Sequence, residues 1–388
     1  MRLATRMSRL GTETAFEVLA RAKELERQGR DVIHLEIGEP DFDTPAEIVE
    51  AAKQALTDGY THYVPAAGIP EVRQTVADHV SRTRGIDVHP EEVVITPGAK
   101  VIIFSPMLSL LQRGDEVIYP DPGFPIYESM IRFTGATPVP IPLRFDRQFT
   151  FDPDELLAKL TDRTKLVVLN SPQNPTGGVV PVADLEALAA GLADRDLMVL
   201  SDEVYSEILY EGEHLSISSF PGMKERTIIL DGWSKTYAMT GWRLGFGVMP
   251  QPLAEQVTKL QVNSVSCAPA FCQIAGATAL RMDRGAVHQM VREFRRRRDT
   301  IVDGLNSIPG FQCLRPKGAF YVFPRITETG LSANELQRQL LEEAGVAALA
   351  GNSFGKNGEG FLRFSYATSV ENIEEALDRI RRHLAAKA

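Results

Sequence analysis

Between about residues 47 and 280, short apolar runs alternate with segments whose apolar residues recur at helical spacing. Each run is continuous in apolar character, as expected for a strand of a parallel sheet that is covered on both faces. Helical segments such as 182–192 separate the runs, which is the alternation of a mostly parallel sheet wrapped by helices. The pattern therefore predicts an α/β fold, with strands at Val93–Ile95, Glu116–Tyr119, Leu166–Leu169, Leu197–Leu200 and Thr227–Leu230.

The two ends of the chain show a different pattern. Residues 15–28 have the spacing of an amphipathic helix, while 320–323 and 361–364 have the character of strands in a smaller sheet. We therefore expect one large domain and one small α+β domain built from both termini. The predicted large domain is 45–282, and the predicted small domain is 1–44 and 283–388.

A last helix is expected near the C-terminus. Thr368 and Glu371 have the spacing of a capping box, in which two side chains satisfy the free amide groups at a helix start. One apolar stripe follows this start, formed by Ile373, Ala376, Leu377, Ile380 and Leu384.

Composition narrows the class of protein. The 388 residues carry a net charge of −9, which favours solubility and argues against a nucleic-acid or membrane surface. The run of arginines 295–298 is expected to be a solvated helix face or a subunit contact. No apolar run approaches membrane-spanning length. The cysteines, Cys267, Cys272 and Cys313, fit no metal spacing and suggest a reducing compartment, so we expect a cytoplasmic protein without a bound metal.

Polar side chains follow the predicted strands at the point where each strand ends. The segments are 96–100 after the first strand, 170–177 after the third, 201–205 after the fourth and 231–235 after the fifth. Ligands of open α/β sheets bind beyond the carboxyl ends of the strands. We therefore expect these four segments to meet at one site.

Lys235 is the most informative residue of this set. A lysine held among apolar walls has a lowered pKa and a nucleophilic amine, as Schiff-base chemistry requires. Asp202 supplies a carboxylate, and Asn174 and Tyr205 supply neutral donors. An anion fits the small residues before the helix at 101, with help from Ser234 and Arg243. Alone, Lys235 is an ordinary loop lysine, Asp202 a helix cap and Asn174 a turn residue; together they match what pyridoxal phosphate needs.

The order and spacing of these motifs resemble those of fold-type-I pyridoxal-phosphate enzymes of the class I/II aminotransferase family, near the bacterial aspartate aminotransferase branch. The matching segments are Ser171–Gly177, Ser201–Glu203 and Ser234–Thr236 followed by Gly241–Arg243. The resemblance extends over nearly the whole chain, from Gly38-Glu39-Pro40-Asp41-Phe42 to Phe361–Ser365.

The resemblance implies a role for each matching residue toward the cofactor. Lys235 matches the lysine that holds pyridoxal phosphate covalently and then moves a proton at the substrate Cα. Asp202 matches the partner of the pyridine nitrogen, and Asn174 and Tyr205 match donors to the ring oxygen O3′. The residues that match the phosphate site are Ser234, Arg243, Ala99 and Lys100.

Further matches concern the substrate and a second subunit. Arg363 matches the arginine that grips the substrate α-carboxylate, for which its planar fork is suited. Gly38 matches a backbone segment that lies over the bound substrate. Asn174 is also expected to contact the substrate. Tyr63 resembles the tyrosine that reaches the phosphate from the neighbouring subunit, which implies a homodimer.

Two residues bear on the choice of amino-acid substrate. Phe124 stands where the family stacks an aromatic ring on the cofactor, and aspartate enzymes commonly have Trp there. Phe stacks but donates no N–H to a substrate carboxylate. Lys100 matches a lysine that, in one bacterial aspartate branch, meets the side-chain carboxylate of the substrate; its other interpretation is support of the phosphate alone. We expect aspartate or glutamate as amino donor and a 2-oxo acid as acceptor, with aromatic or neutral amino acids as the alternative.

Other classes of function are less well supported. A fold-related lyase shares the cofactor residues and stays open at the level of sequence. Residues 351–355 match the G-x-S-x-G pattern of hydrolases, but a glycine-rich stretch follows them where a helix is required. No G-x-G-x-x-G or Walker loop supports a nicotinamide dehydrogenase or a nucleotidase. A sensor domain of a transcription regulator would need an added DNA-binding segment, and the match begins almost at Met1.

Overall fold

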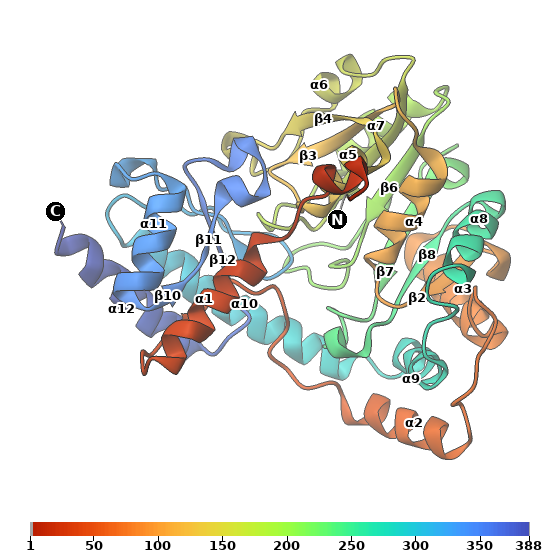
Figure 1. The fold of residues 1–388 in the computed structure, drawn as a ribbon, viewed down its shortest axis with the longest axis horizontal. Helices are drawn as coiled ribbons and strands as arrows, with labels where there is room; N and C mark the ends of the chain where they lie inside the picture. The colour runs from red at the N-terminus through yellow and green to blue at the C-terminus, as the bar shows by residue number, and fades with distance from the viewer. Residues whose placement is uncertain (1–2, 388) are drawn as a thin grey trace.

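A seven-stranded sheet forms the centre of the larger part of the molecule (Figure 1). The computed structural model describes residues 3–387, so residues 1–2 and 388 of the predicted small domain lie outside the described part. The strand order is β2-β8-β7-β6-β5-β3-β4, in which β8 is antiparallel to both of its neighbours and all other pairs are parallel. The bounds are β2 (Val93–Thr96), β3 (Glu116–Asp121), β4 (Thr137–Pro142), β5 (Thr164–Asn170), β6 (Met198–Asp202), β7 (Thr227–Gly232) and β8 (Gly245–Val248).

The five strands predicted in this region are confirmed, and β4 and β8 were missed. β4 alternates Pro with other residues, which is tolerated because it lies at the edge of the sheet. β8 contains Gly245 and Gly247, which weaken any strand signal. Gly245 is needed because a Cβ there would overlap the backbone of Ala99.

Helices cover both faces of the sheet. Ile228 and Leu230 pack on one face against α4, α5 and α8, whereas Ile229 packs on the other against α3 and α9. This period of two explains why continuous apolar runs form these strands. The helices around the sheet are α2 (Ala46–Thr57), α3 (Pro70–Arg84), α4 (Val101–Leu110), α5 (Ile126–Thr134), α6 (Pro153–Ala158), α7 (Val182–Leu192), α8 (Gln251–Val262) and α9 (Ala270–Arg281).

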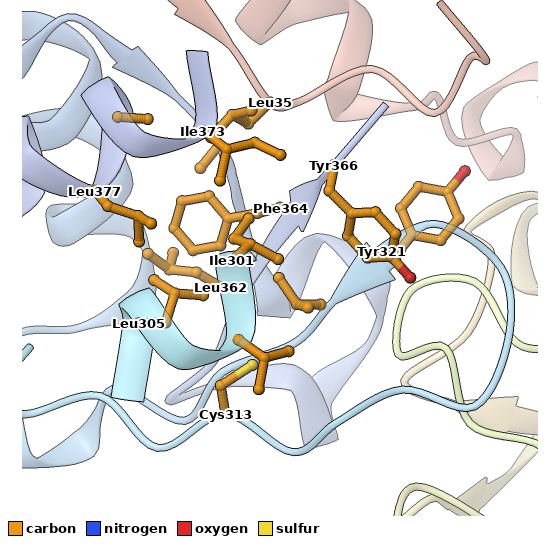
Figure 2. Close-up of a cluster of buried hydrophobic side chains, with 14 of the residues drawn as sticks. Leu35, Ile301, Leu305, Cys313, Tyr321, Leu362, Phe364, Tyr366, Ile373 and Leu377 are labelled. Atoms are coloured by element: carbon orange, nitrogen blue, oxygen red, sulfur yellow. The ribbon is translucent and has the colours of Figure 1, made fainter. Parts of the chain in front are cut away.

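A smaller part of the molecule combines both ends of the chain (Figure 1). Its core includes Leu35 from the N-terminal side, Ile301 from α10, Phe364 from β12 and Ile373 from α12 (Figure 2). Both ends of the chain thus share one core, as predicted for a small domain of 1–44 and 283–388. The exact domain boundaries stay a prediction. The elements are α1 (Thr14–Arg27), α10 (Gly285–Asn306), α11 (Ala333–Gln339), α12 (Val370–Ala385), the parallel pair β1 (Ile33–His34) and β10 (Val346–Ala347), and an antiparallel sheet of β11 (Leu349–Ala350), β12 (Leu362–Ser365) and β9 (Tyr321–Val322).

The start of α12 corrects the predicted capping box. The N-cap is Ser369, whose hydroxyl accepts a hydrogen bond from the Asn372 amide at 3.1 Å. Thr368 instead accepts a hydrogen bond from the Asn372 side chain at 3.0 Å. The predicted box was therefore placed one residue too early.

The arginine run in α10 also differs from the prediction of a solvated face. Arg297 is buried and donates to Asp41 at 2.6 Å. Arg298 is buried as well, donates to the carbonyl of Pro316 at 3.2 Å and lies over the Tyr210 ring. Helical spacing turns these two residues inward, while Arg295 and Arg296 stay exposed.

Within residues 3–387, no helix has both the length and the apolar character needed to cross a membrane. The same part of the chain holds no group of His, Cys, Asp or Glu side chains suited to a metal ion, and its three cysteines are free thiols.

Candidate active site

A cavity of about 430 Å³ opens beyond the carboxyl ends of the parallel strands, between the sheet and the smaller part of the molecule. Its position agrees with the general rule for ligand sites in open α/β sheets. The predicted site residues that line it are Gly38, Ala99, Lys100, Phe124, Asn174, Asp202, Tyr205, Ser234, Lys235, Arg243 and Arg363. Tyr63 is the exception, because it is 88% exposed and does not line this cavity.

Lys235 lies at the base of this cavity, just after β7. Its Nζ donates a hydrogen bond to the carbonyl of Gly38 at 2.5 Å and lies 5.9 Å from the centre of the Phe320 ring. Burial lowers the pKa of Lys235 to about 8, and the positive charges of Arg363, Arg243 and Lys100 act in the same direction against Glu39. About one tenth of the amine is therefore unprotonated at pH 7, far more than for an ordinary lysine, and this is the form that a nucleophile requires.

Asp202 is the last residue of β6 and is buried. Its carboxylate accepts a hydrogen bond from the Tyr127 hydroxyl at 2.6 Å and one from the Val204 amide at 3.3 Å. Burial raises the pKa of Asp202 to about 6, although both hydrogen bonds oppose that rise. A buried carboxylate of this kind is stabilised by a cation placed beside it, such as a protonated ring nitrogen.

Asn174, Tyr205 and Tyr321 form a wall of neutral donors and acceptors. The hydroxyls of Tyr205 and Tyr321 are 2.8 Å apart, and burial raises the pKa of both phenols, so both stay protonated at neutral pH. The side-chain oxygen of Asn174 accepts a hydrogen bond from Arg363 at 3.2 Å, while the backbone N–H of Asn174 donates to the side-chain oxygen of Asn170 at 2.9 Å. This wall suits a phenolate oxygen of a bound ring.

Arg363, on β12, presents a guanidinium to the same cavity. It donates to the carbonyl of Glu36 and lies over the rings of Tyr321 and Phe354, at 4.7 and 4.9 Å from their centres. Its buried Nε has no hydrogen-bond partner among the described residues. An unsatisfied buried donor is costly, so the position is suited to a carboxylate ligand.

Backbone and side chains at the start of α4 form an anion cradle. Gly98 has a φ of +89°, and a Cβ there would overlap the Arg243 guanidinium. Arg243 itself has a φ of 51° and donates to the carbonyl of Thr240 at 2.7 Å. Ser234, Ala99 and Lys100 line the cavity beside this helix start, a position that suits an anion such as phosphate.

The cavity thus contains the full set of groups that pyridoxal phosphate needs. These are an amine of lowered pKa, a buried carboxylate, a wall of neutral hydroxyl and amide groups, and an anion cradle. The residues present therefore fit this cofactor.

Sequence reasoning missed several residues that complete the site. Tyr127 holds Asp202, and Asn170 donates to the backbone of Asp202 and accepts from Asn174. Asn170 directly follows the predicted strand Leu166–Leu169, which was a usable signal. Tyr321 and Glu13 come from distant segments, and no local pattern marks them.

Comparison with known proteins agrees with a site for pyridoxal phosphate. The family model described as aminotransferase class I and II matches residues 30–380. An aspartate aminotransferase of Pyrococcus horikoshii is 45% identical over 371 residues, which cover 95% of this chain and 93% of the relative. Aromatic-amino-acid aminotransferase 2 of Thermococcus litoralis is 44% identical over 360 residues, which cover 92% of each. The solved aspartate aminotransferase of Thermus thermophilus with maleate has a TM-score of 0.95 at 39% identity, covering 99% of this chain and 100% of that one.

The family model spans most of the chain, and the relatives match over nearly their full length. The solved relatives share the whole architecture, including the mostly parallel sheet of fold-type-I enzymes. The chain therefore belongs to the class I and II aminotransferase family and is a transaminase that depends on pyridoxal phosphate.

Proposed function

We propose that this transaminase uses L-aspartate or L-glutamate as amino donor and a 2-oxo acid such as 2-oxoglutarate as acceptor. The observation that carries the proposal is that, besides Lys235 and the Arg243 of the anion cradle, the cavity contains two further cationic side chains, Arg363 and Lys100. Arg363 is suited to the α-carboxylate that every amino acid carries. The ammonium of Lys100 is then the group that would meet the second carboxylate of an acidic substrate.

Different residues of the cavity would bind different parts of the cofactor. Ser234, Arg243 and the start of α4 would hold its phosphate, Asp202 would pair with its ring nitrogen, and Tyr205 and Asn174 would face its ring oxygen. When bound, pyridoxal phosphate supplies an electron sink for charge that develops at the substrate Cα.

Lys235 carries the proton transfer in this proposal. Its Nζ takes the proton from the substrate Cα, because burial keeps a share of the amine unprotonated near neutral pH. Arg363 fixes the α-carboxylate and thereby orients the Cα–H bond toward this amine. Gly38, which lies beside the Tyr321 hydroxyl and lines the cavity, would limit access of water.

Aromatic amino acids are the second candidate donors. Phe124 and Phe354 give the cavity apolar walls, and the Thermococcus litoralis relative is named for aromatic amino acids. A panel of amino donors, each paired with 2-oxoglutarate, oxaloacetate and pyruvate, tests both candidates. The proposal expects the highest kcat/KM with aspartate or glutamate. Release of ammonia and pyruvate without amino transfer would instead indicate a lyase.

The role of Lys235 has its own test. Lys235→Ala is expected to lower turnover by about a thousandfold, the middle of the range for loss of a general base, and to abolish the absorbance of the covalently attached cofactor. The matched control is Lys259→Ala, which removes an exposed lysine on α8. Circular dichroism should show both variants folded. Retention of turnover by Lys235→Ala would contradict the assignment.

We also infer that the protein is a homodimer in the cytoplasm. Tyr63 is 88% exposed, and Leu56 and Tyr60 in the same stretch are exposed apolar side chains that a second copy would cover. Burial raises the pKa of the Cys272 thiol to about 11, and all three cysteines are free thiols, as suits a reducing compartment.

A further inference from the structure

Lys100 is paired with a carboxylate of the chain itself. Its Nζ forms an ion pair with Glu13, which is 87 residues earlier in the sequence. The Glu13 side chain is only 18% exposed, whereas that of Lys100 is 47% exposed and lies 5.3 Å from the centre of the Phe124 ring. Both residues line the cavity that holds Lys235.

The carboxylate of Glu13 faces the cavity rather than its own helix. Glu13 is the N-cap residue of α1, yet its side chain accepts no hydrogen bond from the first turn of that helix. Burial raises the pKa of Tyr321 and lowers that of Arg363, and the negative charge of Glu13 adds to the rise and opposes the fall, so this charge acts inside the cavity. Glu13 therefore occupies the place of an acidic group next to Lys100.

We propose that Glu13 is a specificity-determining residue, an internal counter-ion that a second substrate carboxylate must displace from Lys100. The inference rests on the proposed function, in which Lys100 meets that carboxylate. With a substrate whose side chain is uncharged, Glu13 keeps Lys100 paired, so that no free charge faces the apolar group. With a dicarboxylic substrate, Glu13 moves out and the substrate takes its place. The pair thus lowers selectivity for acidic substrates and admits neutral ones.

Binding of two inert acids to the cofactor-loaded enzyme tests this proposal by calorimetry. Maleate has two carboxylates, and 3-phenylpropionate has one carboxylate and an apolar end. Glu13→Gln is expected to tighten maleate binding by about fivefold, the range of a partly exposed ion pair, and to leave 3-phenylpropionate unchanged or weaker. The matched control is Glu17→Gln, which removes the same charge from an exposed position one turn along α1 and should alter neither affinity.

A second set of variants, made in Lys100→Gln, separates release of Lys100 from simple repulsion between Glu13 and the maleate carboxylate. In Lys100→Gln, Glu13→Gln should change maleate affinity by less than about twofold, because no cation is left to release. An equal gain in both backgrounds, an equal gain for both acids, or no gain at all would overturn the proposal. Failure of the proposed function is distinguishable, because it would appear as a wild-type donor panel without preference for acidic amino acids. A wild-type preference that Glu13→Gln leaves unchanged would refute the counter-ion role alone.

Discussion

Lys235 owes its chemistry to its surroundings, and this has a measurable consequence. Burial and three nearby cations lower the pKa of its amine from 10.5 to about 8. Only the unprotonated amine attacks an aldehyde, so the rate of cofactor binding to the cofactor-free enzyme should rise by about tenfold per pH unit below 8 and level off above it. Stopped-flow absorbance measures this rate. A rise that continues to pH 10 would contradict the lowered pKa.

A charge-removing variant refines this prediction. The positive charge of Arg363 lowers the pKa of Lys235. In Arg363→Gln the rate of cofactor binding should therefore level off at a higher pH than in the wild type. Arg292→Gln removes an exposed arginine of α10 and should leave the plateau in place. Equal shifts in both variants would point to net charge rather than proximity.

For single residues, the sequence was most informative where only one type of amino acid can supply the required chemistry. Lys235 and Asp202 were predicted because their chemistry and their order along the chain are distinctive, and Arg363 was predicted from the family resemblance; the structure brings all three to one cavity. Tyr127 and Glu13 were missed because a tyrosine at a helix start and a glutamate before a helix are common. Only tertiary packing brings Tyr127 within 2.6 Å of Asp202.

At the scale of elements, the position of the α12 cap can be tested. Ser369 satisfies the Asn372 amide, so Ser369→Ala should destabilise the protein by about 1 kcal/mol. Thr368→Ala removes only a hydrogen bond to an exposed side chain and should cost less than about 0.5 kcal/mol. Urea unfolding gives the free energies, and hydrogen exchange at the Asn372 amide reports the cap directly. A larger effect for Thr368→Ala would restore the originally predicted box.

Elements with a strong apolar signal were predicted well, and those shaped by close packing were not. The apolar runs of β5, β6 and β7 were visible because both faces of these strands are buried. β8 was not, because Gly245 and Gly247 make room for neighbouring groups rather than supply an apolar signal. The length of β9 was overestimated, since only two of the four predicted residues pair in the sheet.

At the scale of the whole molecule, the cavity of one chain contains every predicted site residue except Tyr63. The exposed position of Tyr63 fits the proposal that it reaches the cavity of a second copy. A closed symmetric dimer would then place two equivalent tyrosines, each serving the partner's site. This arrangement would make the two chains complementary for catalysis.

Mixed dimers test that complementarity. Lys235→Ala lacks the reactive amine but keeps Tyr63, while Tyr63→Ala keeps Lys235 and should bind the cofactor weakly. In hybrids of the two, the site that contains Lys235 would receive an intact Tyr63 from its partner. Random reassembly in equal amounts should therefore restore about one quarter of the wild-type sites, measured as turnover at limiting cofactor. Tyr60→Ala, which changes a nearby exposed tyrosine, is the matched control and should need no rescue. If the mixture instead gives only the mean of its two separate components, each site is complete within one chain, and Tyr63 has no role across the interface.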